Sequence, residues 1–230
     1  MSVKTEVTGT AASALRRELV VICHRVYEKG FVSAYDGNIS VATPQNTFLI
    51  TRSAVRKGDV TEDDILEIDA GGNIMSGRGK ISTEYKIHLY AYSRRPEVNA
   101  VVHCHPVYTT AFASIGEGLT ENIFPEVVLT LGKVPLCKYA TPSTDELPLS
   151  MEPYIEHAWG MLFQNHGAVT LGKTLKDAYN KMEKLEHTAQ ILFTARLLGG
   201  AKELPPEKLR ELVNLSKQNY GLDVDERNIF

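Results

Sequence analysis

The sequence of 230 residues lacks long apolar runs, paired cysteines and charge blocks. No stretch approaches the roughly 20 apolar residues of a membrane-spanning helix. The N-terminal MSVKTEVTGT has no apolar segment of the kind found in secretory signals. The three cysteines, Cys23, Cys104 and Cys137, show no CxxC spacing and cannot all pair with one another. We therefore expect a cytoplasmic protein with free thiols and no membrane partner.

The chain also has little excess charge of either sign. Its formal net charge is -3 and its pI is about 6.2, which argues against nucleic acid as a partner. A hydrophobic content of 43% and a charged content of 23% are typical of a globular protein. No internal repeat or low-complexity segment divides the sequence, and its length suits one sizeable core. We therefore predict a single domain over residues 1–230.

The spacing of apolar residues predicts short strands interspersed with helices. The predicted helices cover 11–29, Thr83 to just before Pro96, 107–115, 150–159, 175–198 and about 206–217, before a polar tail. The predicted strands cover 38–42, 47–51, 64–69, 101–105, 134–139, 160–164 and 167–171. Most of these strands follow one another too closely for helical crossovers. We therefore expect a largely antiparallel sheet with helices packed on both faces.

Two histidines, His103 and His105, end an apolar run that is typical of a buried strand. Side chains at positions i and i+2 of a strand point to the same face, so the pair supplies half of a transition-metal site. His166 in a Gln-Asn-His-Gly turn offers a third nitrogen, and Glu84 in Ser-Thr-Glu offers a carboxylate. Catalytic zinc sites usually have three protein ligands and an open position. Spacing alone also allows these residues to be ordinary core histidines.

The other histidines, His24, His88, His157 and His187, lack this arrangement, and we expect none of them to bind metal. Cys104 points away from the histidine pair if the strand is regular, so it is predicted to be a buried thiol and not a ligand. The predicted ligand set suits zinc best. Manganese and cobalt stay open as alternatives, because the order of affinities alone does not set the metal.

Two hydroxyl residues, Ser82 and Thr83, stand at the predicted start of a helix. Free backbone N–H groups at a helix N-terminus can bind an anion, and the hydroxyls would assist. The same residues would also serve as a plain helix cap, so the local sequence leaves both interpretations open. Gly37-Asn38-Ile39-Ser40 and Thr51-Arg52-Ser53-Ala54 are two further polar turns, each ordinary when taken alone.

Taken together, these segments resemble the class II aldolase and adducin family, most closely the branch that cleaves L-fuculose 1-phosphate. The resemblance covers roughly residues 10–200. Its motifs are GNIS (37–40), LITRSA (49–54), ISTEYKIHLYAY (81–92), NAVVHCHPVYTTAFA (99–113), VPLCKYATPSTDEL (134–147) and QNHGAVTLGKTLKDAYNKMEKLEHTAQ (164–190). It implies a three-layer α/β/α fold around a mostly antiparallel sheet. It also implies a C4 homotetramer with active sites between subunits.

The resemblance carries roles onto single residues. It implies that the zinc ligands are His103, His105 and His166. It implies that Glu84 binds zinc in the empty site and then serves as the acid/base. It implies that the substrate phosphate is bound by Asn38, Ser53, Ala54, Ser82 and Thr83. The family usually has Thr-Gly where this chain has Ser53-Ala54, and a second serine where it has Thr83.

A more serious departure concerns the proton donor to the aldehyde oxygen. Related bacterial aldolases use a tyrosine from a neighbouring subunit, but the corresponding segment here reads Asn122-Ile123-Phe124-Pro125-Glu126-Val127. Glu126 is therefore a candidate for this role, and a tyrosine of the tail such as Tyr220 is the alternative. The departure leaves the natural aldehyde open.

The function implied by the resemblance is cleavage of a deoxyketose 1-phosphate to dihydroxyacetone phosphate and a small aldehyde. Zinc would act as a Lewis acid on the developing enediolate, and Glu84 would move the proton at the nucleophilic carbon. Alternatives in the same superfamily are a dehydratase, a decarboxylase or a 4-epimerase, although the epimerases typically carry Asp in place of Glu84. A binding module like the adducin head domains is a third class, and the complete His/His/His/Glu set argues against it.

Overall fold

A computed structural model describes the backbone of residues 3–220 and 224–230 and the side chains of residues 12–219 and 224–230. The helices are α1 (Val3–Glu28), α2 (Tyr85–Arg94), α3 (Val107–Ser114), α4 (Pro125–Thr130), α5 (Glu146–Leu149), α6 (Leu175–Leu197) and α7 (Pro206–Tyr220). The strands are β1 (Asn38–Ala42), β2 (Phe48–Thr51), β3 (Ile65–Ile68), β4 (Ile74–Ser76), β5 (Ala100–Cys104), β6 (Leu136–Cys137), β7 (Gly160–Phe163) and β8 (Gly167–Gly172). Single 3₁₀ turns are η1 (Lys57–Asp59), η2 (Glu62–Asp64) and η3 (Glu226–Asn228). No helix in these ranges has the length and apolar character needed to cross a membrane.

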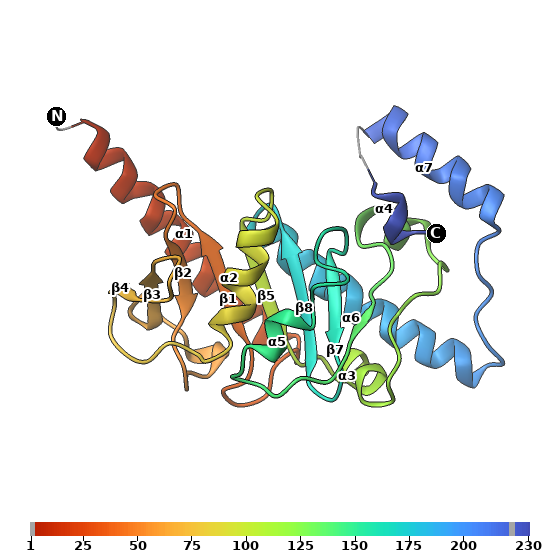
Figure 1. Cartoon of the computed structure of the whole chain (residues 1–230), viewed down its shortest axis with the longest axis horizontal. Coiled ribbons are helices and arrows are strands. Elements are labelled where there is room, and N and C mark those ends of the chain that lie inside the picture. The colour runs from red at the N-terminus through yellow and green to blue at the C-terminus, as the bar shows by residue number, and fades with distance from the viewer. Residues whose placement is uncertain (1–2, 221–223) are drawn as a thin grey trace.

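The strands of the described chain form one central sheet in the order β4-β3-β2-β1-β5-β8-β7-β6 (Figure 1). Neighbouring strands run antiparallel except for β6 and β7, which run parallel. Antiparallel neighbours can be joined by tight turns, as β7 and β8 are by residues 164–166. The prediction of a largely antiparallel sheet is confirmed.

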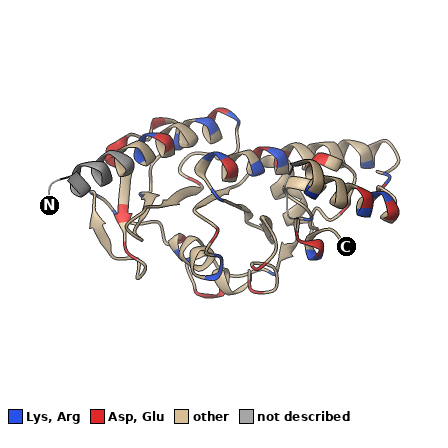
Figure 2. Ribbon diagram, turned by 90° about the horizontal axis from the view of Figure 1, so that it is seen from above, with Lys and Arg blue, Asp and Glu red and all other residues tan. Residues whose placement is uncertain are grey.

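Helices cover both faces of this sheet, as the view from above shows (Figure 2). Val102 of β5 belongs to a core that includes Leu19 of α1 and Leu185 of α6. Its neighbour Val101 belongs to a second core with Ile87 of α2. Because successive side chains of a strand point to opposite faces, one strand contributes to both cores. The three-layer α/β/α arrangement is therefore confirmed, with α1 and α6 on one face and α2 and α5 on the other.

The same alternation separates Cys104 from the histidine pair. Cys104 lies in the core that faces α1 and α6, whereas His103 points to the other face of β5. All three cysteines are buried and free, and burial raises the pKa of the Cys104 thiol above its ordinary value. The prediction that Cys104 is a buried thiol pointing away from the histidine pair is confirmed.

The structure differs from the predicted elements mainly between residues 120 and 160. A helix was predicted over 150–159, but the chain forms the short α5 and then a series of turns. Pro148 and Pro153 lack the N–H groups that a continuous helix would need, so this prediction was wrong. The strand predicted over 134–139 is confined to the two residues of β6, and α4 and β4 were not predicted.

The C-terminal segment 224–230 docks onto the protein instead of forming a free polar tail. Ile229 is fully buried against Val128 of α4 and Leu209 of α7. The Asn228 side chain donates to the Leu131 carbonyl oxygen at 2.9 Å. The prediction of a polar tail therefore missed a small satellite core that connects α4, α7 and the end of the chain.

Candidate functional site

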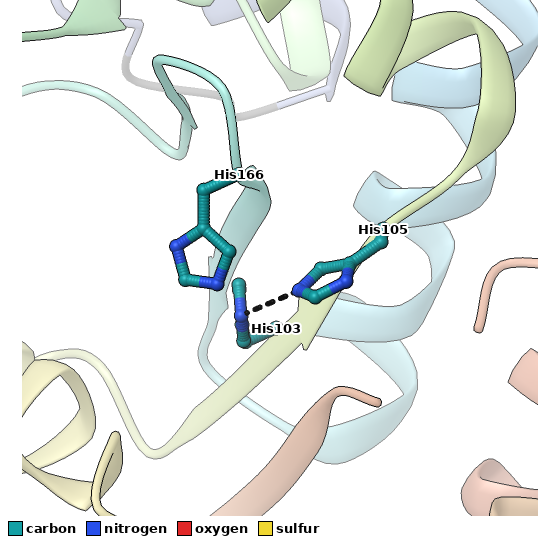
Figure 3. Close-up of side chains that lie close together, drawn as sticks. All are labelled: His103, His105 and His166. Carbon is teal, nitrogen blue, oxygen red and sulfur yellow. Dashed lines mark hydrogen bonds between the residues drawn. The ribbon is translucent and has the colours of Figure 1, made fainter. Parts of the chain in front are cut away.

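Three histidines converge at the end of the central strands (Figure 3). His103 lies near the end of β5, His105 follows that strand, and His166 lies in the turn before β8. Because β5 and β8 pair antiparallel, the end of β5 meets the start of β8. One nitrogen from each ring lies within 4.8 Å of the other two, and the Nε2 atoms of His103 and His105 are 3.2 Å apart. The structure thus brings the three predicted histidines together.

Two glycines let the backbone pass close to these rings. A Cβ atom on Gly37 would lie 2.7 Å from the carbonyl oxygen of His103, and one on Gly167 would lie 2.5 Å from Cδ2 of His105. Gly37 also has a φ of 72°, which side chains other than glycine rarely adopt. The close packing around the histidines therefore requires glycine at both positions.

Glu84 stands at the N-terminal end of α2 and faces the histidines. Its Oε1 lies 2.9 Å from Nε2 of His166, and its Oε2 lies 3.5 Å from Nε2 of His103. Asn38 Nδ2 donates a hydrogen bond of 2.8 Å to Oε2. Burial raises the pKa of the Glu84 carboxyl, but His103, His166 and Asn38 outweigh burial and hold that pKa well below its usual range. Glu84 is therefore ionised beside the three nitrogens.

The histidine cluster has the donor chemistry that a divalent metal needs. His103 Nδ1 donates to the Ala168 carbonyl oxygen at 2.9 Å, so its Nε2 presents a lone pair. Burial lowers the pKa of His103 to about 4 and that of His105 to about 3, which keeps both imidazoles neutral. His166 Nδ1 is buried with no hydrogen-bond partner in the described chain. Neutral imidazoles oriented by a backbone carbonyl fit a zinc-type cation.

A cavity of about 160 Å³ adjoins the cluster. Glu84 and His105 form part of its wall. The wall also contains four of the five residues that the resemblance assigns to phosphate: Asn38, Ser53, Ala54 and Ser82. Thr83 is not among the lining residues, and its Oγ1 lies 2.6 Å from Oγ of Ser143 instead. The cavity therefore places polar groups suited to an anion directly beside the candidate metal ligands.

Four further residues line this cavity and were not predicted as site residues: Tyr35, Asp36, Gly37 and Arg52. The Arg52 guanidinium brings positive charge to the wall, and its Nε lies 2.7 Å from Oδ1 of Asp64. Asp36 Oδ2 lies 3.8 Å from His105 Nδ1. Arg52 lies inside the LITRSA motif, and this is the sequence signal that indicates a role at the cavity. Tyr35 and Asp36 carry no periodic signal.

The candidate proton donor Glu126 does not lie at the cavity of its own chain. Glu126 lies on α4, which packs against α6 and α7 (Figure 1), and its backbone carbonyl accepts a hydrogen bond from Lys184 Nζ. Glu126 is not among the residues that line the cavity. The side chain of Tyr220 lies outside the described residues.

The model of the class II aldolase and adducin N-terminal domain matches residues 17–193. An L-fuculose phosphate aldolase from Methanococcus maripaludis is 34% identical over 180 residues, which cover 78% of this chain and 96% of the relative. A 3-oxo-tetronate 4-phosphate decarboxylase from Escherichia coli is 32% identical over 185 residues, with coverage of 78% and 86%. These relatives are enzymes with two different named reactions.

Solved structures give the same grouping. An L-fuculose 1-phosphate aldolase superimposes with a TM-score of 0.83 at 28% identity, and the match covers 89% of this chain and 97% of that one. The L-fuculose-1-phosphate aldolase of Thermus thermophilus gives a TM-score of 0.73 at 31% identity, with coverage of 84% and 100%. The fold is that of a class II aldolase-type lyase. The chain belongs to the class II aldolase and adducin family.

Proposed function

We propose that this protein cleaves a deoxyketose 1-phosphate, of the L-fuculose or 5-deoxypentulose type, to dihydroxyacetone phosphate and a small aldehyde. The observation that carries the proposal is the shared cavity. Glu84 and His105 line the same hollow of about 160 Å³ as Ser53 and Ser82. A phosphate bound by the polar wall would place the adjoining ketone next to the histidines. The relatives named L-fuculose phosphate aldolase support this proposal.

The three histidines His103, His105 and His166 would hold one divalent cation, for which zinc fits best and manganese or cobalt are alternatives. When bound, the cation supplies Lewis acidity for the negative charge that develops on the substrate oxygens. Neutral ligands suit that task, because they add no negative charge to the site.

The residues of the cavity bind and orient the substrate. The hydroxyls of Ser53 and Ser82 can donate to phosphate oxygens, and Arg52 adds positive charge to the same wall. Phosphate is remote from the reacting carbons, so its binding energy can be used to orient them. This division explains why anion-binding groups and Glu84 occur in one small cavity.

Glu84 carries the proton in the proposed reaction. In the direction of condensation, its carboxylate takes a proton from the hydroxyl-bearing carbon of dihydroxyacetone phosphate, and the resulting enediolate attacks the aldehyde. In the direction of cleavage, the bond between C3 and C4 breaks and the electron pair stays on C3. Glu84, which must first take a proton from water, gives that proton to C3. The C4 hydroxyl proton must leave to a second group.

We propose that Glu126 of the partner subunit takes that second proton. The proposed assembly is a C4 homotetramer whose active sites lie between subunits. Each subunit would be a single cytoplasmic domain. Glu126 does not line the cavity of its own chain. This arrangement would explain why the position on α4 that replaces the family's tyrosine carries a carboxylate.

Decarboxylation of a 3-oxo sugar-acid phosphate is a second candidate, favoured by the relatives named 3-oxo-tetronate 4-phosphate decarboxylase. Loss of carbon dioxide from such a four-carbon acid leaves the same enediolate, which becomes dihydroxyacetone phosphate when it gains a proton. The two reactions would therefore share the phosphate cavity and Glu84. They differ only in the fragment that leaves.

The experiment must identify that fragment, because both reactions release dihydroxyacetone phosphate. The purified protein is incubated with a panel of ketose 1-phosphates and with 3-oxo-tetronate 4-phosphate, and both products are measured. Aldehyde formed together with dihydroxyacetone phosphate supports the aldolase. Carbon dioxide without aldehyde supports the decarboxylase, and neither product from any substrate contradicts both. The Glu84→Gln variant, purified in parallel, reports any contaminating activity.

A further inference from the structure

A chain of hydrogen bonds runs from Glu84 into the core between α2 and the sheet, and the two bonds made by His88 are buried. Asn38 Nδ2 donates to Glu84 Oε2 at 2.8 Å, and Asn38 Oδ1 lies 2.5 Å from Nε2 of His88. His88 Nδ1 lies 2.6 Å from Oγ of Ser40, which lies 2.6 Å from the hydroxyl of Tyr92. Ser40 and His88 have no exposed surface. We call these five residues the Glu84 hydrogen-bond chain.

The spacing of these residues in the sequence explains how the Glu84 hydrogen-bond chain forms. Glu84, His88 and Tyr92 are four residues apart and follow one another along one side of α2. Asn38 and Ser40 are two residues apart on β1 and therefore point to the same face of the sheet. Because α2 packs on β1, the side chains from the helix alternate with those from the strand along the hydrogen-bond chain. His88 thus links two residues of β1 through its two ring nitrogens.

The Asn38 amide sets the direction of every hydrogen bond in the Glu84 hydrogen-bond chain, because its nitrogen lies 2.8 Å from Glu84 Oε2 and its oxygen lies 2.5 Å from His88 Nε2. A carboxylate only accepts, so the Asn38 nitrogen must face it and the Asn38 oxygen must face His88. His88 Nε2 therefore carries the hydrogen, and Nδ1 accepts from Ser40, which in turn accepts from Tyr92. Burial lowers the pKa of His88 to about 3 and raises the pKa of the Tyr92 hydroxyl, so both stay neutral. With these assignments, every hydrogen bond in the series has one donor and one acceptor, and each runs in the direction from Tyr92 toward Glu84.

We propose that His88 is a positioning residue for Glu84, because its Nε2–H holds the Asn38 amide in the one orientation that donates to the carboxylate. If the amide turned over, its oxygen would face the Glu84 carboxylate and two acceptors would repel each other. Ser40 and Tyr92 fix the tautomer of His88 that prevents this. The inference rests on the proton-carrying role of Glu84 proposed above.

The inference also changes what Asn38 does. Its oxygen accepts from His88, and its nitrogen donates to Glu84 and, at 3.2 Å, to Ser82 Oγ. The amide therefore connects the acid/base group with a hydroxyl of the phosphate wall. When Glu84 moves away from the histidines toward a substrate carbon, the hydrogen bond from Asn38 is the one that can still guide it.

The test compares two amides in place of His88. In His88→Gln the amide nitrogen can reach the position of Nε2 and donate to Asn38, whereas in His88→Asn it reaches only the position of Nδ1. Ile87→Val is the control for packing, because Ile87 is fully buried on the same helix but is not part of the Glu84 hydrogen-bond chain. Measurements are kcat and KM for cleavage, the metal content, and the tautomer of His88 from ¹⁵N NMR of the full-length protein.

We expect His88→Asn to lower kcat about 10- to 100-fold, the usual cost of losing such an outer partner, with little change in KM or metal content. His88→Gln should recover most of the loss, and Ile87→Val should match the wild type. The NMR spectrum should show His88 with its hydrogen on Nε2. Equal kcat values for the Asn, Gln and Val variants would overturn the inference, as would a hydrogen on Nδ1.

The design separates this inference from the proposed function. If the wild-type protein cleaves no ketose 1-phosphate, the aldolase proposal fails, and the tautomer of His88 still decides whether the hydrogen-bond chain has the polarity inferred here. The tautomer also decides the matter if neither amide variant folds.

Discussion

Replacing Glu84 by glutamine separates the chemical role of the carboxylate from its structural role. Glu84 accepts hydrogen bonds from His166 and Asn38, at 2.9 and 2.8 Å. A glutamine amide has one oxygen, so one of those two donors would face an N–H group. A hydrogen bond to a charged group contributes about 1.5–3 kcal/mol. Part of that loss is offset because a buried charge disappears, so we expect the free energy of unfolding to fall by at most about 2 kcal/mol.

Turnover should respond far more strongly than stability. An amide cannot carry a proton between substrate atoms, and general acid–base catalysis contributes about 10²–10⁴-fold to rates. We therefore expect kcat to fall by about that factor, while the three histidines still hold metal. The assay follows dihydroxyacetone phosphate, with elemental analysis for metal. Glu67→Gln, on β3 and bonded to Thr47, is the matched control and should keep wild-type turnover. A Glu84→Gln enzyme with wild-type kcat would refute the reasoning.

Three further predictions concern stability. Metal-free protein should become less stable as pH falls below about 6.5, because His88, His103 and His105 bind protons when unfolded but have folded pKa values of about 3, 4 and 3. Each histidine can lower the free energy of unfolding by up to about 1.4 kcal/mol per pH unit. Urea unfolding that gave the same free energy at pH 7, 6 and 5 would contradict this. Ala54 has a φ of 57°, so Ala54→Gly should raise the free energy of unfolding by about 1 kcal/mol. A lower melting temperature would argue against backbone strain at this position. Ile229→Ala should cost about 2–5 kcal/mol, and an unchanged melting temperature would show that the docked C-terminal segment adds nothing.

The histidine cluster could be predicted because most of it follows from local rules. Alternation along one strand puts His103 and His105 on the same face, and a short turn places His166 at the start of the next strand. The pairing of β5 with β8 is not local, however, because β6 and β7 come between them in the chain. Local sequence made His166 and Glu84 candidates, and only the resemblance to a family assigned them to the same site as the pair.

Features that depend on packing between distant segments could not be predicted. His88 was not predicted to have a role in the site, because its link to Asn38 depends on how α2 lies on β1. Thr83 has the same local sequence signal as Ser82, yet its hydroxyl meets Ser143 and does not line the cavity. The docking of Ile229 on α4 likewise joins segments about a hundred residues apart in sequence, for which no periodic pattern exists.

The most direct test of the central claim is the carbon balance of one reaction, with and without a chelator. The purified protein is given ¹³C-labelled L-fuculose 1-phosphate or a 5-deoxypentulose 1-phosphate, and the products are followed by NMR. The account predicts equimolar dihydroxyacetone phosphate and aldehyde, loss of both on chelation, and recovery with Zn²⁺. Cleavage that persists in the chelated protein, or intact substrate under every metal condition, would contradict it.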